Sequence, residues 1–266
     1  MSHNKTIHTQ FTHIGHSLDN IIRDFDQNGR IFGNQNRNII KLFDLNGMTL
    51  NVKGFKITNS INQITYRFFR KSKAQRSFEY ANKLLSLNIG TPQPIGHYEF
   101  KTSFLFKKSF YISEHLDTDL TYRDLTTDFS ISDYEAILRA FTRFTYTLHE
   151  KGVNFLDHSP GNTLIKRTQN GYNFYLVDLN RMRFETMSIK KRIRNFAKLT
   201  IHKDMVKIMS HEYAKCTGLK ESYIFNLMWS YTKIFQEAYY RKNRMKKRLF
   251  FWKKKYRSIP CQSPIS

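Results

Sequence analysis

Residues 154–162 read Asn154-Phe-Leu-Asp157-His-Ser-Pro-Gly-Asn162, and residues 173–180 read Asn173-Phe-Tyr-Leu-Val-Asp178-Leu-Asn180. Four residues separate the aspartate of the first stretch from its last asparagine. Pro-Gly between them is a turn signal, so the chain bends and both side chains can point into one cleft. The second stretch has strand character and ends in another aspartate. Three polar side chains are therefore expected around one cleft.

This spacing is typical of phosphoryl transfer. The reaction needs a carboxylate that orients the attacking hydroxyl and accepts its proton, together with metal ions and a lysine on the nucleotide phosphates. Asp157 is the candidate base. Asn162 and Asp178 are the candidate ligands of Mg²⁺, which prefers oxygen ligands and binds through one or two carboxylates plus phosphates.

The lysine is expected on a strand upstream. Lys53 lies in the β-rich run Leu50-Asn-Val-Lys53, whose period of two places Asn51, Lys53 and Phe55 on one face; Lys56 is a weaker rival. Its partner is predicted to be Glu79, the only carboxylate between Lys53 and Glu99. Lys53 and Glu79 thus complete the candidate catalytic set.

Each residue also has an ordinary structural interpretation. Asp157 alone is more often a turn or cap residue, and Asp178 a cap at a strand end. Lys53 alone is an edge lysine in solvent, and Glu79 an exposed helix residue. It is their combination, in this order and on these element types, that favours phosphoryl transfer.

The first half of the chain predicts a small sheet with one inserted helix. Residues 38–44 and 48–55 are β-rich and meet at Asn46-Gly47, a strong hairpin signal. Residues 72–87 have one apolar face of helical spacing. A second hairpin is expected from residues 103–106 and 109–113, closed by Lys107-Lys108. Residues 1–28 carry few signals.

The second half is expected to be mainly α-helical. A helix after Ser132 is predicted from a capping box with Glu135, and Gly152 is its predicted C-cap. Further helices are expected at 191–209 and 221–240. We therefore predict an N-terminal lobe at 1–115, a C-terminal catalytic lobe at 116–240 and a basic aromatic tail at 241–266.

Three segments resemble a known family, the lipopolysaccharide core kinases that act on Kdo or heptose sugars. They are residues 66–79, residues 88–99, and Asp157-His-Ser-Pro-Gly-Asn162 together with Val177-Asp-Leu-Asn-Arg181. The resemblance spans roughly residues 38–200. It implies an α+β, two-lobed protein-kinase-like fold, with a small β-rich N-terminal lobe that contains one helix.

The resemblance also implies an activity. It would be an ATP- and Mg²⁺-dependent kinase that phosphorylates a sugar hydroxyl of a glycolipid from the cytoplasmic side of the membrane. Lys53 would contact the nucleotide phosphates and pair with Glu79; Asp157 would be the base; Asn162 and Asp178 would hold metal. The segment Ser113-Glu114-His115 would join the lobes, and its backbone would meet adenine.

The sequence departs from protein kinases at several motifs. Phe155-Leu156 stands where they have His-Arg, and Leu179-Asn180 stands where they have Phe-Gly; no Ala-Pro-Glu segment follows. Only Gly29 and Gly33 suggest a glycine-rich phosphate loop. These departures argue against a regulated protein kinase more than against phosphoryl transfer. The covering of the phosphates and the role of His158 are left open.

A formal charge of +23 implies an anionic partner. Residues 238–266 hold ten Lys or Arg among aromatic residues and no acid, which suits an anionic membrane surface. Two more basic clusters lie between Arg67 and Arg76 and between Lys190 and Lys198. Each run has a solvated face as its ordinary interpretation. No helix-turn-helix, zinc-finger or RRM signature supports nucleic acid.

We expect a cytoplasmic protein at the inner face of the membrane, because no run of about 18 apolar residues and no secretory signal occur. The two cysteines, Cys216 and Cys261, support neither a disulfide framework nor a zinc site. Two alternatives stay open, an atypical protein kinase and a non-catalytic basic binding module on a kinase-like scaffold. The acceptor sugar and the oligomeric state are not predicted.

Overall fold

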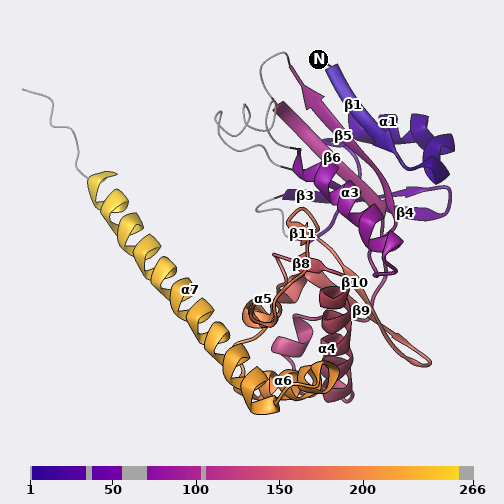
Figure 1. Cartoon of the computed structure of the whole chain (residues 1–266). Helices are drawn as coiled ribbons and strands as arrows, with labels where there is room; N and C mark the ends of the chain where they lie inside the picture. Colours follow the sequence, from indigo (N-terminus) through magenta and orange to yellow (C-terminus); the bar gives the residue numbers. More distant parts are fainter. Residues whose placement is uncertain (1, 34–37, 56–70, 103–105, 258–266) are drawn as a thin grey trace, which may run out of the picture. The chain divides into compact units, whose positions relative to one another are not determined.

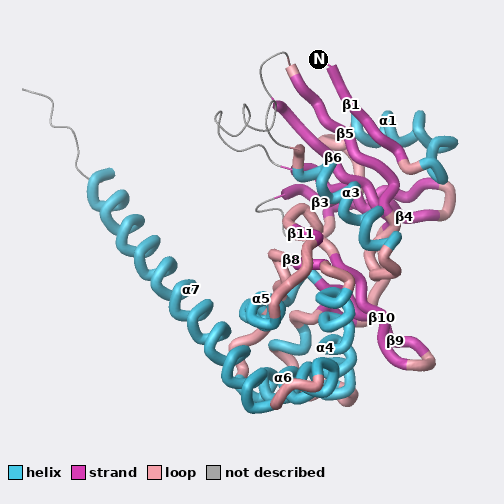
Figure 2. The backbone as a smooth tube through the Cα atoms, in the orientation of Figure 1, coloured by secondary structure: helices cyan, strands magenta, loops and turns pink. Residues whose placement is uncertain are grey.

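The computed structural model describes residues 2–33, 38–55, 71–102 and 106–257, with side chains described between residues 4 and 248 of these ranges. Figures 1 and 2 show its helices and strands. The chain divides into two compact units, residues 1–186 and residues 187–266. The predicted lobes, 1–115 and 116–240, are a different division and stay a prediction.

The first unit contains a six-stranded antiparallel sheet of order β1-β5-β6-β4-β3-β2. Its strands are β1 (Ser2–Ile7), β2 (Arg30–Ile31), β3 (Asn38–Leu45), β4 (Met48–Phe55), β5 (Pro94–Lys101) and β6 (Phe106–Glu114). The predicted β3–β4 hairpin is confirmed. Its turn residues Asn46 and Gly47 have φ of 50° and 78°, as the two-residue turn favoured by Asn-Gly requires.

The second predicted hairpin, which paired residues 103–106 with residues 109–113, was wrong. Residues 109–113 belong to β6, which pairs with β5 from Pro94↔Ser113 to Lys101↔Phe106, and Lys107-Lys108 lie inside β6. Strand β5 was not predicted, because its residues Pro94 and Gly96 disfavour a strand. The missed strand is stabilised from both sides, because β1 pairs with it from Ser2↔Lys101 to Ile7↔Gly96. Residues 103–105 lie outside the described residues.

Helices α1 (Gly15–Arg23) and α3 (Lys73–Ser86) cover opposite faces of this sheet. On β5, Tyr98 donates to Asp19 of α1, whereas the neighbouring His97 packs against Phe78 of α3. Successive strand residues point to opposite faces. The α1 face holds a buried cluster that includes Leu18, Ile22, Leu50, Val52 and Ile112.

The predicted helix at 72–87 is confirmed as α3. Ser72 is its N-cap and its hydroxyl accepts a hydrogen bond from the Gln75 amide at 3.0 Å. Its apolar face is buried together with the second half of the unit: Ala81 and Leu84 pack in one cluster with residues of β8, β10 and the segment around Leu179. This packing joins α3 to β8 and to the segment around Leu179, which carry Asp157 and Asp178 close to their ends.

Short strands follow helix α4 (Tyr134–Glu150), and the strand expected before Asp178 is among them as β10. They are β8 (Val153–Phe155), β9 (Thr163–Thr168), β10 (Gly171–Leu176) and β11 (Met182–Phe184); β7 (Leu120–Thr121) precedes α4. Antiparallel pairs form between β9 and β10, β7 and β9, and β8 and β11. The 3-10 helices described in this first unit are η1 (Thr9–Ile14), η2 (Asp124–Thr126) and η3 (Pro160–Asn162).

The capping box predicted for α4 was wrong. The N-cap is Asp133, without a side-chain cap bond, and Glu135 instead pairs with Arg139 one turn later at 2.6 Å. The other end is as expected within one residue: Lys151 is the C-cap, and Gly152 follows with φ 70°, a left-handed conformation that glycine adopts at low cost.

Asp133 gives a pH-dependent prediction. Arg167 of β9 donates two hydrogen bonds to it and lowers the pKa of Asp133 to about 2. Because this pKa lies below the unfolded value, the pair contributes stability that is present above about pH 4 and is lost as the pH falls toward 2. An NMR titration of the carboxyl group should show the low midpoint. Arg167→Gln should raise it to the ordinary range, whereas Lys166→Gln should not; an unchanged midpoint in Arg167→Gln contradicts the assignment.

The second unit consists of α5 (Ile189–Arg194), the 3-10 helix η4 (Asn195–Lys198), α6 (Lys203–Thr217) and α7 (Glu221–Arg257). The helix predicted at 191–209 is interrupted, because Thr200 Oγ1 accepts from the His202 amide at 3.0 Å and donates to Met205. Helix α7 runs well past the predicted end at residue 240. None of the described helices has the length and apolarity needed to cross a bilayer.

Candidate active site

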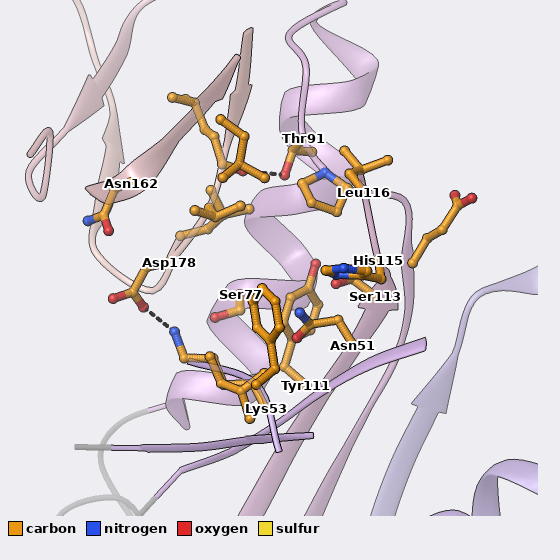
Figure 3. Close-up of a pocket in the computed structure, with 18 of the residues that line it drawn as sticks. Asn51, Lys53, Ser77, Thr91, Tyr111, Ser113, His115, Leu116, Asn162 and Asp178 are labelled. Carbon is orange, nitrogen blue, oxygen red and sulfur yellow. Dashed lines mark hydrogen bonds and ion pairs between the residues drawn. The ribbon is translucent and has the colours of Figure 1, made fainter. Parts of the chain in front are cut away.

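A cavity of about 470 Å³ lies within the first unit. Figure 3 shows residues from β4, from the end of β6, and from the segment after β10 gathered around it. The lining includes Asn51, Lys53, Tyr111, Leu116, Asn162 and Asp178. Its volume is within the range of small-molecule sites.

Lys53 forms an ion pair with Asp178 in this cavity (Figure 3). The distance from Lys53 Nζ to Asp178 Oδ1 is 2.7 Å, and the lysine side chain is 14% exposed. The ammonium also lies 5.4 Å from the centre of the Phe55 ring. Asn51 and Lys53 both line the cavity, as the alternation of β4 predicts. Lys56, the rival lysine, lies outside the described residues.

Strand pairing brings Asn162 next to Asp178. Leu176 of β10 pairs with Thr163 of β9, and the Val177 amide donates to the Asn162 carbonyl at 3.0 Å. The next residue, Asp178, has φ 58°. This left-handed conformation is uncommon for aspartate and accompanies the sharp exit from the strand.

The same region offers two oxygen ligands to a cation. Asp178 Oδ1 accepts from Lys53 and from Asn180 Nδ2 at 2.8 Å, whereas Oδ2 has no partner among the described residues. Asn162 donates its amide nitrogen to the Asp157 carbonyl at 2.9 Å, so its amide oxygen is the remaining group. One carboxylate and one amide oxygen fit Mg²⁺ supported by phosphates. No cluster of three His, Cys, Asp or Glu side chains occurs among the described residues.

Asp157 lies in the turn after β8 and is connected to the cavity through Asn162. Its carboxylate contacts Arg181, with 3.1 Å between Arg181 Nη1 and Asp157 Oδ1. The Asp157 side chain is 26% exposed. The carboxylate is therefore reachable from solvent.

The predicted Lys53–Glu79 pair is not formed. Glu79 accepts from Lys71 at 2.9 Å and from Gln75 at 3.0 Å, and Lys53 pairs with Asp178 instead. The reason is local: Lys71 precedes α3 and Gln75 lies one turn before Glu79, so both reach its carboxylate along the helix. Glu79 is on the predicted helix but does not line the cavity.

The predicted connection Ser113-Glu114-His115 lines the cavity, together with Leu116. Two of its backbone N–H groups are already used, since Glu114 donates to the Gln93 carbonyl and His115 to the Thr49 carbonyl. These two amides are engaged within the sheet, and the contact of the segment with adenine stays a prediction. The amide of Leu116 has no partner among the described residues and takes the role of available donor.

The segment around Gly29 and Gly33 borders the same cavity. Both glycines have positive φ, 89° and 68°, and a Cβ on Gly29 would lie 2.4 Å from the ring of Phe43. Phe32, between them, lines the cavity and stands edge-on to His115 with 5.0 Å between ring centres. Residues 34–37 lie outside the described residues.

Two further side chains, His158 and Tyr111, lie at this site. His158 is 1% exposed and stacks on Phe141 of α4 at an interplanar angle of 10°, with Nε2 3.3 Å from the Thr145 hydroxyl. It thus anchors the turn between β8 and η3, which carries Asp157, to α4. Burial raises the pKa of the Tyr111 phenol, which therefore stays protonated.

Three residues near the site were missed by the sequence reasoning. Asn180 positions Asp178, Arg181 contacts Asp157, and Leu116 offers the amide beside the cavity. Asn180 and Arg181 come two and three residues after Asp178, and the signal available in the sequence was their polarity so close to a candidate metal ligand. For Leu116 the sequence carries no such signal, because the fold alone decides which backbone amides lack a partner.

The chain is similar to known proteins at two levels. The family described as "Lipopolysaccharide kinase (Kdo/WaaP) family" matches residues 28–217. A solved structure described as "WaaP in complex with acyl carrier protein" aligns with a TM-score of 0.61 at 13% identity, covering 89% of this chain and 99% of that chain. No curated protein sequence gives a significant match. The structural likeness confirms the predicted α+β, protein-kinase-like fold.

Proposed function

Because the chain belongs to the lipopolysaccharide kinase (Kdo/WaaP) family, we propose that it transfers the γ-phosphate of ATP to a Kdo or heptose hydroxyl of the lipopolysaccharide core. The family makes it a phosphotransferase that uses ATP and acts on a sugar hydroxyl. The observation that carries the residue assignment is the Lys53–Asp178 pair inside a cavity that Asn162 also lines. The sugar and the individual roles are the proposal.

Adenine would lie against the end of β6. The Leu116 amide is the donor that the described residues leave available, and the Glu114 carbonyl beside it would be the acceptor. A purine edge needs one donor and one acceptor at this spacing. Phe32 would cover the ring from the side of β2 and β3.

The phosphates would lie at Lys53. Its ammonium is held by Asp178 at 2.7 Å and would bind the phosphate oxygens once nucleotide enters. Asn162 and Asp178 would hold Mg²⁺, which offsets the charge of the phosphates when bound. Asn180 keeps the Asp178 carboxylate in place by its 2.8 Å hydrogen bond. Glu79 remains a candidate partner of Lys53, reached only by exchanging its bonds to Lys71 and Gln75.

Asp157 would act on the acceptor. Its carboxylate would accept a hydrogen bond from the sugar hydroxyl and orient it toward the γ-phosphate. It would take the hydroxyl proton as the new bond from the sugar oxygen to the γ-phosphorus forms and the bond from that phosphorus to the leaving ADP breaks. The 2.9 Å hydrogen bond from Asn162 to the Asp157 carbonyl fixes the loop that carries the base. Base and metal ligands are thus kept at a constant separation.

The test is transfer of labelled γ-phosphate from ATP and Mg²⁺ to purified lipopolysaccharide or its sugar-lipid precursor. Label in the sugar of the glycolipid supports the proposal. Label only in protein, in a lysate freed of lipid, favours the atypical protein kinase instead. Binding of ATP without any transfer contradicts the proposed acceptor, and absence of ATP binding contradicts the nucleotide site.

We place the enzyme at the cytoplasmic face of an anionic membrane, with α7 as the contact. After Thr232 none of the side chains described in α7, which end at residue 248, is buried. Basic residues alternate there with exposed apolar ones: Ile234, Phe235, Tyr239, Tyr240 and Met245. A basic helix that also exposes apolar side chains binds anionic lipid through both groups.

Neutralising four charges of α7 should weaken binding to vesicles of anionic lipid by about 10²–10³-fold, because each Lys or Arg near the surface contributes about 1 kcal/mol. The variant changes to Gln the residues Lys242, Arg244, Lys246 and Lys247. Its control changes four exposed lysines elsewhere in the second unit: Lys203, Lys207, Lys215 and Lys220. Vesicle sedimentation measures both, and equal losses would contradict a specific role of α7.

A further inference from the structure

Three arginines surround the loop that carries Asp157, and the backbone fixes where two of them lie. Strand β11 pairs with β8 so that Met182 lies opposite Phe155, and the Leu156 amide donates to the Arg181 carbonyl at 3.1 Å. Arg181 is therefore held beside the turn that contains Asp157. Its contact with the Asp157 carboxylate follows from strand register rather than from a chance side-chain orientation.

Arg183 lies in β11, two residues after Arg181. Met182 between them is buried, and Arg183 as the next residue of the strand points to the opposite, exposed side. Arg183 is exposed, and its guanidinium makes no ion pair with the described residues. Arg181 is 57% exposed. Arg181, directly before β11, and Arg183, within it, thus supply two solvent-accessible guanidinium groups, the first of them in contact with Asp157.

Arg123 approaches the loop at Gly161. Its Nη2 lies 2.8 Å from the position that a Cβ on Gly161 would occupy, so the absence of a side chain at Gly161 makes room for the guanidinium. Arg123 is exposed, and within the described chain its guanidinium has no acidic partner. Three positive groups accompany one carboxylate, Asp157, whose own ion pair is with Arg181.

The Arg181–Asp157 pair is too exposed to be explained by stability. Surface ion pairs contribute about 0–1 kcal/mol, so exchanging one partner costs little. A guanidinium binds carboxylate and phosphate groups through two parallel hydrogen bonds, a geometry that lysine cannot reproduce. An arginine beside the base is therefore suited to hold an anionic group next to the reacting hydroxyl.

We propose that Arg181, Arg183 and Arg123 form the acceptor site and bind a carboxylate or phosphate that neighbours the hydroxyl to be phosphorylated. Arg181 holds Asp157 until the acceptor arrives, then transfers its hydrogen bonds to the acceptor's anionic group and leaves the carboxylate free to bind the hydroxyl. This inference rests on the proposed function, since it specifies the acceptor of the same site.

The test compares acceptor glycolipids that differ in charge. One carries its acid groups, one has its sugar carboxylates methyl-esterified, and one has its phosphates removed. Arg181→Gln and Arg183→Gln should each raise KM for the charged acceptor about 10-fold to 100-fold, as expected for loss of hydrogen bonds to a charged group, and leave KM for ATP unchanged. The neutralised acceptor that mimics this loss in the wild type identifies the group as carboxylate or phosphate.

Matched variants separate binding from folding. Arg181→Lys keeps the charge but should recover only part of the acceptor affinity. Arg23→Gln removes an exposed arginine of α1, which covers the face of the sheet opposite to the cavity, and should leave the KM for the acceptor unchanged. Equal losses of kcat with all acceptors and unchanged KM would overturn the proposal, because Arg181 would then only position Asp157.

Direct binding keeps this proposal separate from the proposed function. Calorimetric titration of the charged glycolipid into the protein without ATP should give an affinity that falls in Arg181→Gln and Arg183→Gln. If the wild type binds the glycolipid in this way but transfers no phosphate, the acceptor site stands and the proposed reaction fails. If affinity is the same in all variants, the acceptor site is wrong even when the wild type transfers phosphate.

Discussion

Replacing Asp157 with asparagine is expected to lower the rate of phosphate transfer by about 10²–10⁴-fold, the usual contribution of a general base. Asparagine keeps the size of the side chain but cannot take a proton from the sugar hydroxyl. ATP affinity should be unchanged, since Asp157 is not among the residues that line the cavity. Initial rates with saturating ATP and glycolipid, together with calorimetric ATP titration, measure the two effects.

The matched control is Asp128→Asn, which makes the same change in an exposed loop, where the carboxylate accepts hydrogen bonds from Ser130. It should retain wild-type rates. An Asp157→Asn enzyme that keeps more than about a tenth of the wild-type kcat would contradict the assignment of Asp157 as the general base, because loss of a general base lowers the rate by more than that. A lowered ATP affinity in that variant would instead indicate a role at the nucleotide.

Gly90→Ala is expected to destabilise the protein by about 2–4 kcal/mol, from overpacking and one lost hydrogen bond. A Cβ on Gly90 would lie 2.2 Å from the carbonyl oxygen of Phe174, which is backbone and cannot move aside as a side chain could. Separating the two segments would also lengthen the 2.9 Å hydrogen bond from the Leu176 amide to the Gly90 carbonyl. Thermal unfolding should show a Tm lower by about 5–15 °C.

The effect should reach the site, because Leu176 leads directly to Asp178. Thr91 Oγ1 donates to the Leu176 carbonyl at 2.8 Å, so this contact and that of Gly90 both set the position of the strand end. Gly15→Ala is the control, since its Cβ would meet Ile7 at an ordinary 3.4 Å. A Gly90→Ala protein as stable as Gly15→Ala would show that the two segments separate without cost.

The local features of the chain were predictable where neighbours in sequence determine them. Asn46-Gly47 specifies its hairpin because glycine and asparagine tolerate the positive φ of the turn, which the structure confirms. The helix α3 follows from the cap at Ser72 and the spacing of its apolar face. The turn at Pro160-Gly161 and the strand before Asp178 are equally local.

Features that depend on distant partners were mispredicted or missed. The strand β5 was not predicted, since Pro94 and Gly96 disfavour a strand that only pairing with β1 and β6 stabilises. Glu79 was predicted as the partner of Lys53 because it is the only carboxylate between Lys53 and Glu99, whereas in the structure Lys53 pairs with Asp178. The roles of Lys53, Glu79, Asp157, Asn162 and Asp178 in catalysis stay predictions.

By itself the sequence determined the residue types and intervals of a phosphoryl-transfer site, because spacing along a strand, turn or helix fixes which side chains can share a face. Only the tertiary structure decided which charges meet. The pairing of β9 with β10 places Asn162 beside Asp178, and the pairing of β8 with β11 places Arg181 beside Asp157. Strand register joins residues that are far apart in sequence, and no local preference encodes it.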